Sequence, residues 1–374
     1  MKVLLIEPFF SGSHKKWAEE YLRFSSHEVK LLTLPGKHWK WRMEGGAIKL
    51  AELYLEMLST PDVILTTDML NLTLFQSLTK TQHIPAVLYM HENQLTYPWS
   101  EGDKEKKHNR DFHYAFINYT SCLAADYILF NSEYHRLSFE NELPRLLNMF
   151  PDNRGLQTVA KISKKSRVVP IGIDLEKLQK RVTKKENRIP IVLWNHRWEY
   201  DKNPIEFFKT LEELKNEGIE FQLVVLGEHT TNYPEVFDAA KATFEKELLH
   251  WGYCDNPNDY IEWLWKSDVL PVTSYQDFFG ISVVEAMLCG VYPLLPHRLA
   301  FPEHLPTELK AAHLYADKDE LKSKLKRVLI EKPPINSTMK IYLEKYDWRF
   351  VVKELDTTLS NLSSTKHGHQ IIAP

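Results

Sequence analysis

The stretch Asp277-Phe-Phe-Gly-Ile-Ser-Val-Val-Glu285-Ala-Met-Leu-Cys-Gly290 places an acidic residue shortly before a glycine and a second acidic residue eight positions after the first. Apolar segments flank it, Val269–Thr273 before and Val291–Pro296 after. This order predicts a strand, a tight loop, a helix and another strand. Gly280 lets the backbone come close to a ligand, and the first turn of the helix offers free N–H groups to a negative charge. The first acid is expected in the loop and the second about two turns along the helix.

The composition predicts a folded chain with two domains. Its 374 residues fit two domains of ordinary size, and 43% hydrophobic with 26% charged residues excludes a disordered chain. No apolar run approaches the ~20 residues of a membrane span, and Met1–Ile6 is too short for a signal peptide. Cys122, Cys254 and Cys289 lack the spacing of a disulfide framework or a metal site, so a cytoplasmic location is expected. The net charge of −3 means that any nucleic-acid binding must rely on local basic patches.

Short apolar runs alternate with helical patterns in both halves of the chain, and the second series begins near Ile189. Such alternation predicts parallel βαβ units. Ligands of these sheets bind beyond the carboxyl ends of the strands, so two facing doubly wound domains predict an interdomain cleft. The expected strands are Val3–Ile6, Val29–Leu32, Val63–Leu65, Ala86–Met90, Tyr127–Phe130, Ile191–Trp194, Phe221–Leu226, Val269–Val272 and Val291–Leu294.

The helices between these strands complete two Rossmann-like domains. They are expected to start at His14, Pro204, Glu235, Asn258 and Ile281 and to cover Ala47–Leu58, Leu70–Leu78 and Phe112–Ala125. The predicted boundaries are an N-terminal domain over residues 1–170, a C-terminal domain over 175–345, a terminal helix over 346–362 that returns to the first domain, and a flexible tail over 363–374. Asp317 and Asp319 have the spacing of a metal site, but their place before Leu321 is more typical of a helix N-terminus.

Arg197 and Lys202 follow the first strand of the second domain. An arginine fork binds two phosphate oxygens at once, and a nearby lysine adds a mobile point charge. The alternative is a solvated charged loop that opens a helix at Pro204, and for this loop by itself that alternative has the greater weight. Together with Asp277 and Glu285, the diphosphate-binding interpretation is favoured.

Two strand exits in the first domain carry polar residues. Gly12, Ser13 and His14 join the first strand to a helix whose N-terminus can bind phosphate, and the absence of G-x-G-x-x-G weakens a dinucleotide oxidoreductase reading. His91, followed by Glu92, Asn93 and Gln94, leaves another strand. An unperturbed histidine titrates near pH 6.5, so it can bind a substrate hydroxyl or move a proton. The alternative is a turn capped by Asn93 beside a structural histidine.

The segment Lys37-His38-Trp39-Lys40-Trp41-Arg42 interleaves bases and aromatics. In an extended conformation its two tryptophans share one face and Lys40 and Arg42 share the other. Tryptophan faces stack on nucleobases, while cations bind phosphate. The alternative is a surface hairpin whose tryptophans pack on the core.

The motif from Asp277 to Glu285, with the pair Arg197 and Lys202, resembles the donor site of retaining GT-B glycosyltransferases of family 4, although that family usually has Glu at the first acid. Further blocks resemble the tRNA-queuosine α-mannosyltransferases over almost the whole chain. These blocks are Gly12–Lys15, Lys37–Arg42, His91–Pro98, Phe116–Asp126, Phe130–Ser132 and Phe301–Glu303. The resemblance implies a GT-B fold with a C-terminal crossover helix, and metal-independent transfer of mannose from GDP-mannose to the queuosine base in the anticodon of tRNA-Asp.

The resemblance also implies roles for individual residues, with no cofactor, metal, membrane or obligate protein partner. The catalytic set is His91, Asp277 and Glu285; the donor set is Gly12, Ser13, Arg197, Lys202, Phe278, Phe279, Gly280, Ile281 and Glu285; the acceptor set is His14, Lys37, Trp39, Lys40, Trp41, Arg42, Glu92, Asn93 and Gln94. One rival reading is a GT-B enzyme that glycosylates a polysaccharide or lipid with another nucleotide sugar. A rival of another class is a catalytically silent RNA-binding protein, against which the intact Arg197, Lys202 and Glu285 argue.

Overall fold

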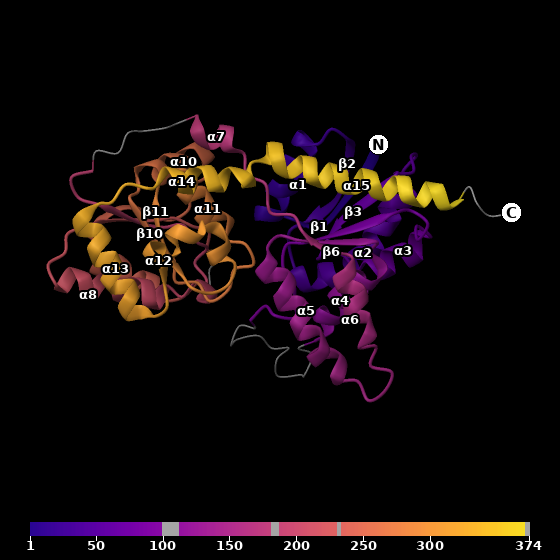
Figure 1. Ribbon diagram of the computed structural model, residues 1–374, viewed down its shortest axis with the longest axis horizontal. Helices are drawn as coiled ribbons and strands as arrows, with labels where there is room; N and C mark the ends of the chain where they lie inside the picture. Colours follow the sequence, from indigo (N-terminus) through magenta and orange to yellow (C-terminus); the bar gives the residue numbers. More distant parts are fainter. Residues whose placement is uncertain (99–111, 181–186, 230–232, 371–374) are drawn as a thin grey trace. The chain divides into compact units, whose positions relative to one another are not determined.

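The computed structural model describes residues 1–98, 112–180, 187–229 and 233–370 (Figure 1). The chain divides into two compact units. Unit 1 comprises Met1–Gly172 and Trp348–Pro374, and unit 2 comprises Ile173–Asp347. Each unit contains a six-stranded sheet whose strands pair in parallel. The predicted fold class, α/β with two Rossmann-like units, is therefore confirmed.

The sheet of unit 1 has the order β2-β1-β3-β4-β5-β6. The chain leaves β1 toward β2 on one side and then crosses to β3 on the other. The carboxyl ends of β1 and β3 therefore flank the topological switch point, where ligands bind in doubly wound sheets. The strands are β1 Lys2–Phe10, β2 Glu28–Pro35, β3 Val63–Thr67, β4 Ala86–Met90, β5 Tyr127–Phe130 and β6 Ser166–Val168.

Helices cover both faces of this sheet because alternate strand residues point to opposite sides. Leu4 and Ile6 of β1 belong to the core that packs beneath α2 to α6. On the other face α15 lies along α1 (Figure 1). The helices are α1 Gly12–Phe24, α2 Trp39–Leu55, α3 Leu72–Thr79, α4 His113–Ala124, α5 Glu133–Asn148, α6 Gln157–Lys164 and α15 Trp348–Gln370.

The terminal helix α15 is held to unit 1 by specific contacts. Asp356 accepts hydrogen bonds from the hydroxyls of Tyr21 at 2.9 Å and Ser25 at 2.8 Å. Trp348 donates its indole N–H to Glu20 at 2.6 Å, and a Cβ added at Gly172 would lie 2.2 Å from the Trp348 ring. The helix begins at Trp348 and continues to Gln370, beyond the end expected at residue 362. The last four residues of the expected flexible tail lie outside the described part of the chain.

The sheet of unit 2 has the order β12-β11-β10-β7-β8-β9. Its strand order reverses between β7 and β10, so the loops that leave these two strands flank its switch point. The strands are β7 Ile191–Trp194, β8 Gln222–Val225, β9 Leu248–Trp251, β10 Val269–Pro271, β11 Tyr292–Pro296 and β12 Leu314–Tyr315.

An aromatic core fills one face of this second sheet. Trp198 stacks on Phe237 with ring centroids 4.3 Å apart, and both belong to the cluster beneath α8, α9 and α13. Asp317 caps α13 by accepting the N–H groups of Asp319 and Glu320, so its prediction as a helix N-terminus is confirmed. The helices are α7 Leu175–Gln179, α8 Pro204–Asn216, α9 Val236–Thr243, α10 Pro257–Lys266, α11 Ile281–Leu288, α12 Lys310–His313, α13 Lys318–Glu331 and α14 Ser337–Leu343, with 3₁₀ turns η2 Tyr200–Lys202, η3 Phe301–His304, η4 Thr307–Leu309 and η5 Glu344–Tyr346.

Candidate active site

His91 directly follows β4 in unit 1, and neighbouring residues hold both its backbone and its ring in place. Its backbone N–H donates to Asp68 Oδ1 at 2.7 Å, and its carbonyl accepts from Asn131 Nδ2 at 2.8 Å. Its ring lies against those of Trp17 and Tyr89, with centroids 4.8 Å away in both cases. Burial, followed by the nearby His14 and His135, holds the pKa of His91 well below its usual value. The Nε2 atom of this neutral ring is buried and has no hydrogen-bond partner among the described residues.

His14 lies beside His91, with ring centroids 4.5 Å apart, but its pKa is shifted in the opposite direction. Its Nδ1 is 3.0 Å from Glu7 Oε2, while Glu7 Oε1 accepts the Phe9 N–H at 2.7 Å. Burial alone would lower the pKa of His14, but the charge and hydrogen bond of Glu7 outweigh it and raise the pKa to about 9. At pH 7 a protonated histidine therefore adjoins a neutral one at the carboxyl ends of β1 and β4.

The residues after His91 form a tight turn. Asn93 accepts the N–H groups of Leu95 at 3.1 Å and Thr96 at 2.9 Å, as the structural reading of Asn93 requires. Gln94 donates its side-chain amide to the half-buried Glu92 at 2.8 Å. Asn93 and Gln94 are buried, so Glu92 is the most exposed of these three predicted acceptor residues.

Asp68 supports this turn and was not singled out from the sequence. It follows β3, and its Oδ1 accepts the N–H groups of His91 and, at 3.4 Å, Glu92. Burial raises its pKa to about 8, partly opposed by the charge of His14. Asp68 directly follows the apolar strand Val63–Thr67, just as His91 directly follows an apolar strand. The sequence did not single out Asp68, because no other polar motif adjoins it.

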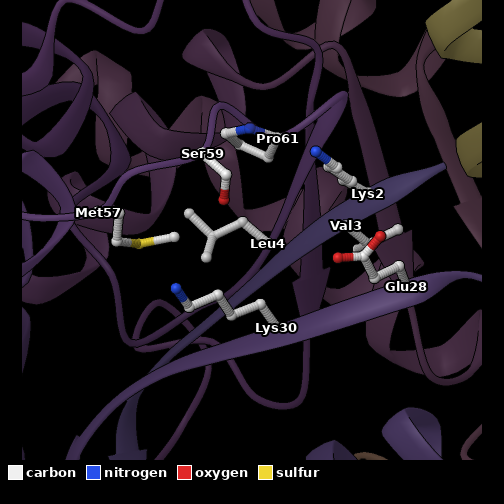
Figure 2. A pocket seen from close by; sticks show the side chains of 8 residues that line it. All are labelled: Lys2, Val3, Leu4, Glu28, Lys30, Met57, Ser59 and Pro61. Carbon is white, nitrogen blue, oxygen red and sulfur yellow. The ribbon is translucent and has the colours of Figure 1, made fainter.

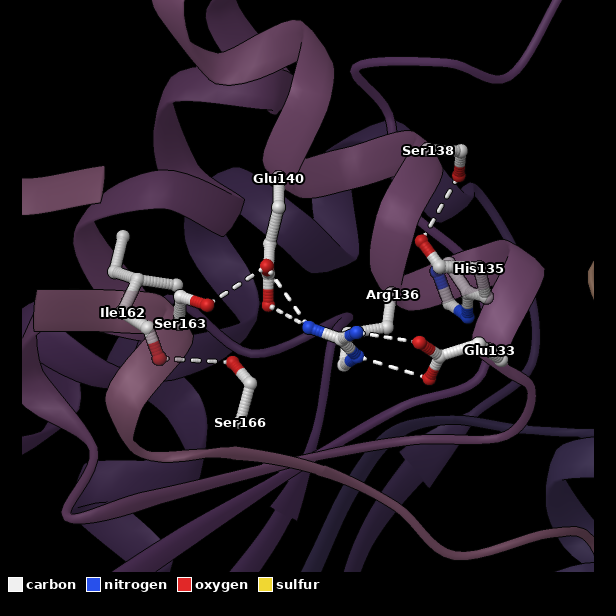
Figure 3. A network of polar contacts seen from close by, with 8 residues as sticks. All are labelled: Glu133, His135, Arg136, Ser138, Glu140, Ile162, Ser163 and Ser166. Carbon is white, nitrogen blue, oxygen red and sulfur yellow. Dashed lines mark hydrogen bonds and ion pairs between the residues drawn. The ribbon is translucent and has the colours of Figure 1, made fainter. Parts of the chain in front are cut away.

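The start of α5 carries a network of polar contacts, part of which is shown in Figure 3. Ser132 caps the helix by accepting the His135 N–H at 3.0 Å, and Asn131 Oδ1 lies 2.9 Å from His135 Nδ1. In the next turn the Arg136 guanidinium binds Glu133 at 2.5 Å and Glu140 at 3.0 Å. Ser163 of α6 also donates to Glu140, at 2.9 Å. This network fixes the helix end that holds the His91 carbonyl.

The first turn of α1 contains Gly12 and Ser13, both of which are exposed. Gly12 has φ of +51°, in the left-handed region that favours glycine. The sharp turn expected between the first strand and its helix is therefore present, and the helix begins at Gly12 instead of His14.

The segment Lys37–Arg42 differs from the expected extended conformation, because α2 begins at Trp39. Trp39 and Trp41 therefore point about 160° apart around the helix axis instead of sharing a face. Trp39 packs on Tyr114 at a centroid distance of 5.2 Å, whereas Trp41 is 60% exposed. Lys37 is exposed, Lys40 lies 5.6 Å from the Trp39 ring centroid, and Arg42 donates to the Pro35 carbonyl at 3.0 Å.

In unit 2 the loop after β7 brings Lys202 against Asp277. The Lys202 side chain is buried, and its Nζ lies 3.0 Å from Asp277 Oδ1, 3.2 Å from Asp201 Oδ2 and 2.6 Å from the Gln276 carbonyl. Burial alone would lower the pKa of Lys202, but these two carboxylates raise it. Asp277 Oδ2 is buried and has no hydrogen-bond partner among the described residues.

Arg197 occupies a different environment from Lys202, although both belong to the predicted donor set. Its side chain is 53% exposed and pairs with Glu199 at 2.9 Å. The structure thus brings Lys202 and Asp277 together and leaves Arg197 at the surface of the same loop.

The loop after β10 leads into α11. Gly280 has φ of +82° and caps the helix, and a Cβ at this position would lie 3.0 Å from the Phe301 ring. Phe278 and Phe279 are buried, and Ile281 is half-buried. Thr273 donates to the Lys202 carbonyl at 2.9 Å, so the two loops at the switch point are hydrogen-bonded to each other.

Glu285 lies in the second turn of α11 and is buried. Its Oε2 accepts the hydroxyl of Tyr260 at 2.9 Å. Burial and the charge of Glu285 raise the pKa of Tyr260 well above its usual value, so this hydroxyl remains a donor. Tyr260 lies on α10, and no sequence motif connected it to Glu285.

One group of side chains in the described part of the chain has the spacing of metal ligands. Glu7, His14 and His91 offer atoms within 4.8 Å of one another. Glu7 and His14 are 3.0 Å apart, and the carboxylate of Glu7 raises the pKa of His14. The short distances in this group therefore include an ion pair that shares a proton.

A pocket in unit 1 lies away from these residues. The pocket in Figure 2 is lined by Lys2, Glu28 and Lys30 at the starts of β1 and β2, at the opposite end of the sheet from His91. No helix found in these residues has the length and apolar character needed to cross a membrane.

Known structures match this fold over nearly its whole length. The Anabaena protein Alr3699/HepE in complex with UDP aligns with a TM-score of 0.66 at 14% identity, covering 96% of this chain and 100% of its own. The sucrose-phosphate synthase of Thermosynechococcus elongatus aligns with a TM-score of 0.70 at 13% identity, covering 98% and 100%. The profile of glycosyl transferases group 1 matches residues 176–342. The chain is a GT-B glycosyltransferase.

The N-terminal half identifies the family more closely. The profile described as tRNA-queuosine alpha-mannosyltransferase N-terminal matches residues 2–173. A Drosophila melanogaster protein named tRNA-queuosine alpha-mannosyltransferase is 30% identical over 368 residues, which cover 94% of each chain. This chain belongs to the tRNA-queuosine α-mannosyltransferase family.

Proposed function

We propose that this protein transfers mannose from GDP-mannose to the queuosine base in the anticodon of tRNA-Asp. The similarity to the Drosophila relative over 94% of the chain supports the acceptor and the sugar. In this proposal unit 2 binds the nucleotide sugar and unit 1 binds the acceptor.

The observation that carries the donor site is the buried contact of Lys202 with Asp277 at the switch point of unit 2. A departing diphosphate gains charge in the transition state, and fixed cations and amides stabilise that charge best. Lys202 supplies a fixed cation, and the exposed Arg197 adds a bidentate fork by leaving Glu199. Glu285, oriented by Tyr260, binds the ribose hydroxyls, and the free oxygen of Asp277 accepts a sugar hydroxyl.

Transfer is proposed to retain the anomeric configuration and to need no metal. The acceptor hydroxyl attacks C1 of the sugar on the face that the diphosphate leaves. A new C1–O bond forms as the C1–O bond to phosphate breaks, and the acceptor proton passes to a phosphate oxygen. His91 contributes a neutral ring, and its Nε2, which is buried and has no hydrogen-bond partner among the described residues, is proposed to bind a sugar hydroxyl. Lys202 and Arg197 take the charge-neutralising role that a metal has in other transferases.

We propose that the start of α2 binds the acceptor. A base in an anticodon loop must be splayed out to reach a sugar donor, and such bases stack on aromatic rings. Trp41 offers an exposed ring, and Lys37, Lys40 and Arg42 offer cations for the adjoining phosphates. Trp39 supports this helix end by packing on Tyr114. The half-buried Glu92 is proposed to accept a hydrogen bond from the modified base.

The deciding experiment compares two tRNA-Asp preparations that differ only in queuosine or guanine at the modified position. With GDP-mannose and EDTA present, mass spectrometry of the nucleosides should show one added hexose on queuosine alone. Sensitivity of the product to α-mannosidase tests retention, and UDP-glucose in place of GDP-mannose tests donor choice. The Glu285→Gln protein is the matched inactive control. Modification of both tRNAs, or of neither, contradicts the proposed acceptor.

A further inference from the structure

His304 of unit 2 lies against the loop between β10 and α11, which the proposed function assigns to the donor. We call this segment the donor loop. His304 belongs to none of the motifs predicted from the sequence. It ends η3 and is fully buried, at 0% exposure. Its Nε2 lies 2.6 Å from the carbonyl oxygen of Phe279, and its Nδ1 lies 2.9 Å from the hydroxyl of Tyr346. A carbonyl only accepts hydrogen bonds, so Nε2 carries the ring proton and Nδ1 accepts from Tyr346. One tautomer satisfies both contacts.

The ring is also held by packing and by its charge state. The rings of Phe279 and Tyr346 meet His304 nearly edge-on, with centroids 5.1 and 5.5 Å away. Burial lowers the pKa of His304 to about 4, although its hydrogen bond to Phe279 acts in the opposite direction. The ring is therefore neutral near pH 7 and presents one fixed N–H to the donor loop.

The carbonyl that His304 holds belongs to the same peptide unit as the N–H of Gly280. A peptide unit is planar and trans, so its C=O and N–H point in opposite directions. Fixing the Phe279 carbonyl toward His304 therefore aims the Gly280 N–H away from it. Gly280 has φ of +82° and the conformational freedom of a glycine, so this amide needs an external contact to stay in one orientation.

We propose that His304 is a positioning residue of the transfer reaction: by holding the Phe279 carbonyl, it keeps the Gly280 amide directed at the diphosphate of the nucleotide sugar. This inference rests on the proposed function, which assigns the donor to the loop before α11. His304 does not touch the donor itself. It acts through one backbone peptide.

The experiment compares His304→Leu with His304→Gln. Leucine has comparable bulk and no donor, while glutamine restores an amide N–H near the position of Nε2. His313→Leu is the matched control, because His313 is also buried in unit 2 and donates from Nδ1 to a carbonyl, that of Pro293 at 2.8 Å, on a strand away from the loop. The measurements are GDP affinity by calorimetry, single-turnover rate with GDP-mannose, tRNA affinity and melting temperature.

We expect His304→Leu to lower the single-turnover rate by roughly tenfold to a hundredfold. This is less than the roughly hundredfold to thousandfold cost of removing such a donor outright, because the Gly280 amide is misdirected and not lost. GDP affinity should fall as well, tRNA affinity should stay unchanged, and glutamine should recover most of the loss. His313→Leu should lower the melting temperature to a similar extent and leave rate and GDP affinity intact. Equal rates and GDP affinities for His304→Leu and His313→Leu, or no recovery with glutamine, would overturn the inference.

If His304→Leu does not fold, Tyr346→Phe tests the same point. It removes the hydroxyl that holds Nδ1 of His304 and should lower the rate by roughly threefold, because the ring is then less firmly placed against the Phe279 carbonyl; an unchanged rate overturns the inference. A wild-type protein that binds GDP but modifies no tRNA would refute the proposed function alone, because the effect of His304→Leu on GDP affinity would still be measurable.

Discussion

Replacing Lys202 by methionine tests the centre of the proposed donor site. Lys202 is the cation shared by Asp201 and Asp277, whose side chains are 1% and 15% exposed. Methionine keeps the bulk of the stem but leaves both carboxylates without their charge partner. Breaking a buried ion pair by removing one partner costs about 3–5 kcal/mol, because the remaining charge stays desolvated. In a unit of this size that loss corresponds to a melting temperature lower by roughly 10 °C.

The assay is denaturant unfolding at pH 7 for Lys202→Met and for Lys202→Met combined with Asp277→Asn. The double variant should regain part of the lost stability, because the amide needs no counter-charge. Lys215→Met is the control: Lys215 pairs with Glu247 at 2.9 Å but is 33% exposed, so its loss should stay below about 1 kcal/mol. GDP affinity should fall only in the Lys202 variants. If Lys202→Met is no less stable than the Lys215 control, the buried ion pair does not exist in solution and the reasoning is refuted.

Three further predictions follow from other contacts. Tyr260→Phe removes the hydroxyl that Glu285 accepts and should weaken GDP binding by roughly tenfold in calorimetry, with tRNA affinity unchanged. Gly172→Ala would bring a methyl group to 2.2 Å from the Trp348 ring and should cost at least about 1–3 kcal/mol in unfolding experiments, whereas unchanged stability would mean that the ring can move. His14 has its pKa raised from 6.5 to about 9 in the folded chain, so its contribution of about 3 kcal/mol is present below pH 6.5 and is lost as the pH rises toward 9; His14→Gln should flatten that part of the stability profile.

The strands of both sheets were predictable because parallel strands buried on both faces have continuous apolar sequences. Val63–Leu65 and Ala86–Met90 illustrate this, since every residue of the corresponding strands is buried. The edge strands β9 and β12 were missed for the opposite reason. Leu248–Trp251 is only partly buried, and Leu314–Tyr315 is too short to stand out from the adjoining helix.

The helix α2 shows where a local pattern misled. The alternation of bases and tryptophans in Lys37–Arg42 fits a strand, but the structure continues the helix of residues 47–55 back to Trp39. The deciding contacts are distant in sequence: Trp39 packs on Tyr114, and both join a small core with Met69. Local propensity is weak beside such tertiary packing.

Within the candidate site, the sequence predicted residues that belong to a motif with a characteristic spacing. It did not predict residues that position another residue through a hydrogen bond. Asp277 and Glu285 were proposed as site residues because of their separation in the sequence. Tyr260, Asp68 and His304 were missed because each acts through hydrogen bonds to residues on other elements. A hydrogen bond of this kind leaves no periodic or local pattern in the chain.

Arg197 and Lys202 show most clearly what the fold adds. They belong to one loop, and by charge and spacing they were equal members of one predicted phosphate clamp. The structure makes them different, because the partners of Lys202 include Asp277, which lies far along the chain in the loop between β10 and α11. Lys202 is therefore held in place before any donor arrives, whereas Arg197 is exposed and paired with Glu199 by a contact of little energy. In the proposed donor site Lys202 therefore supplies a preorganised charge, and Arg197 supplies a second charge that must be recruited. We expect the loss of Lys202 to damage both stability and GDP binding, and the loss of Arg197 to damage GDP binding alone.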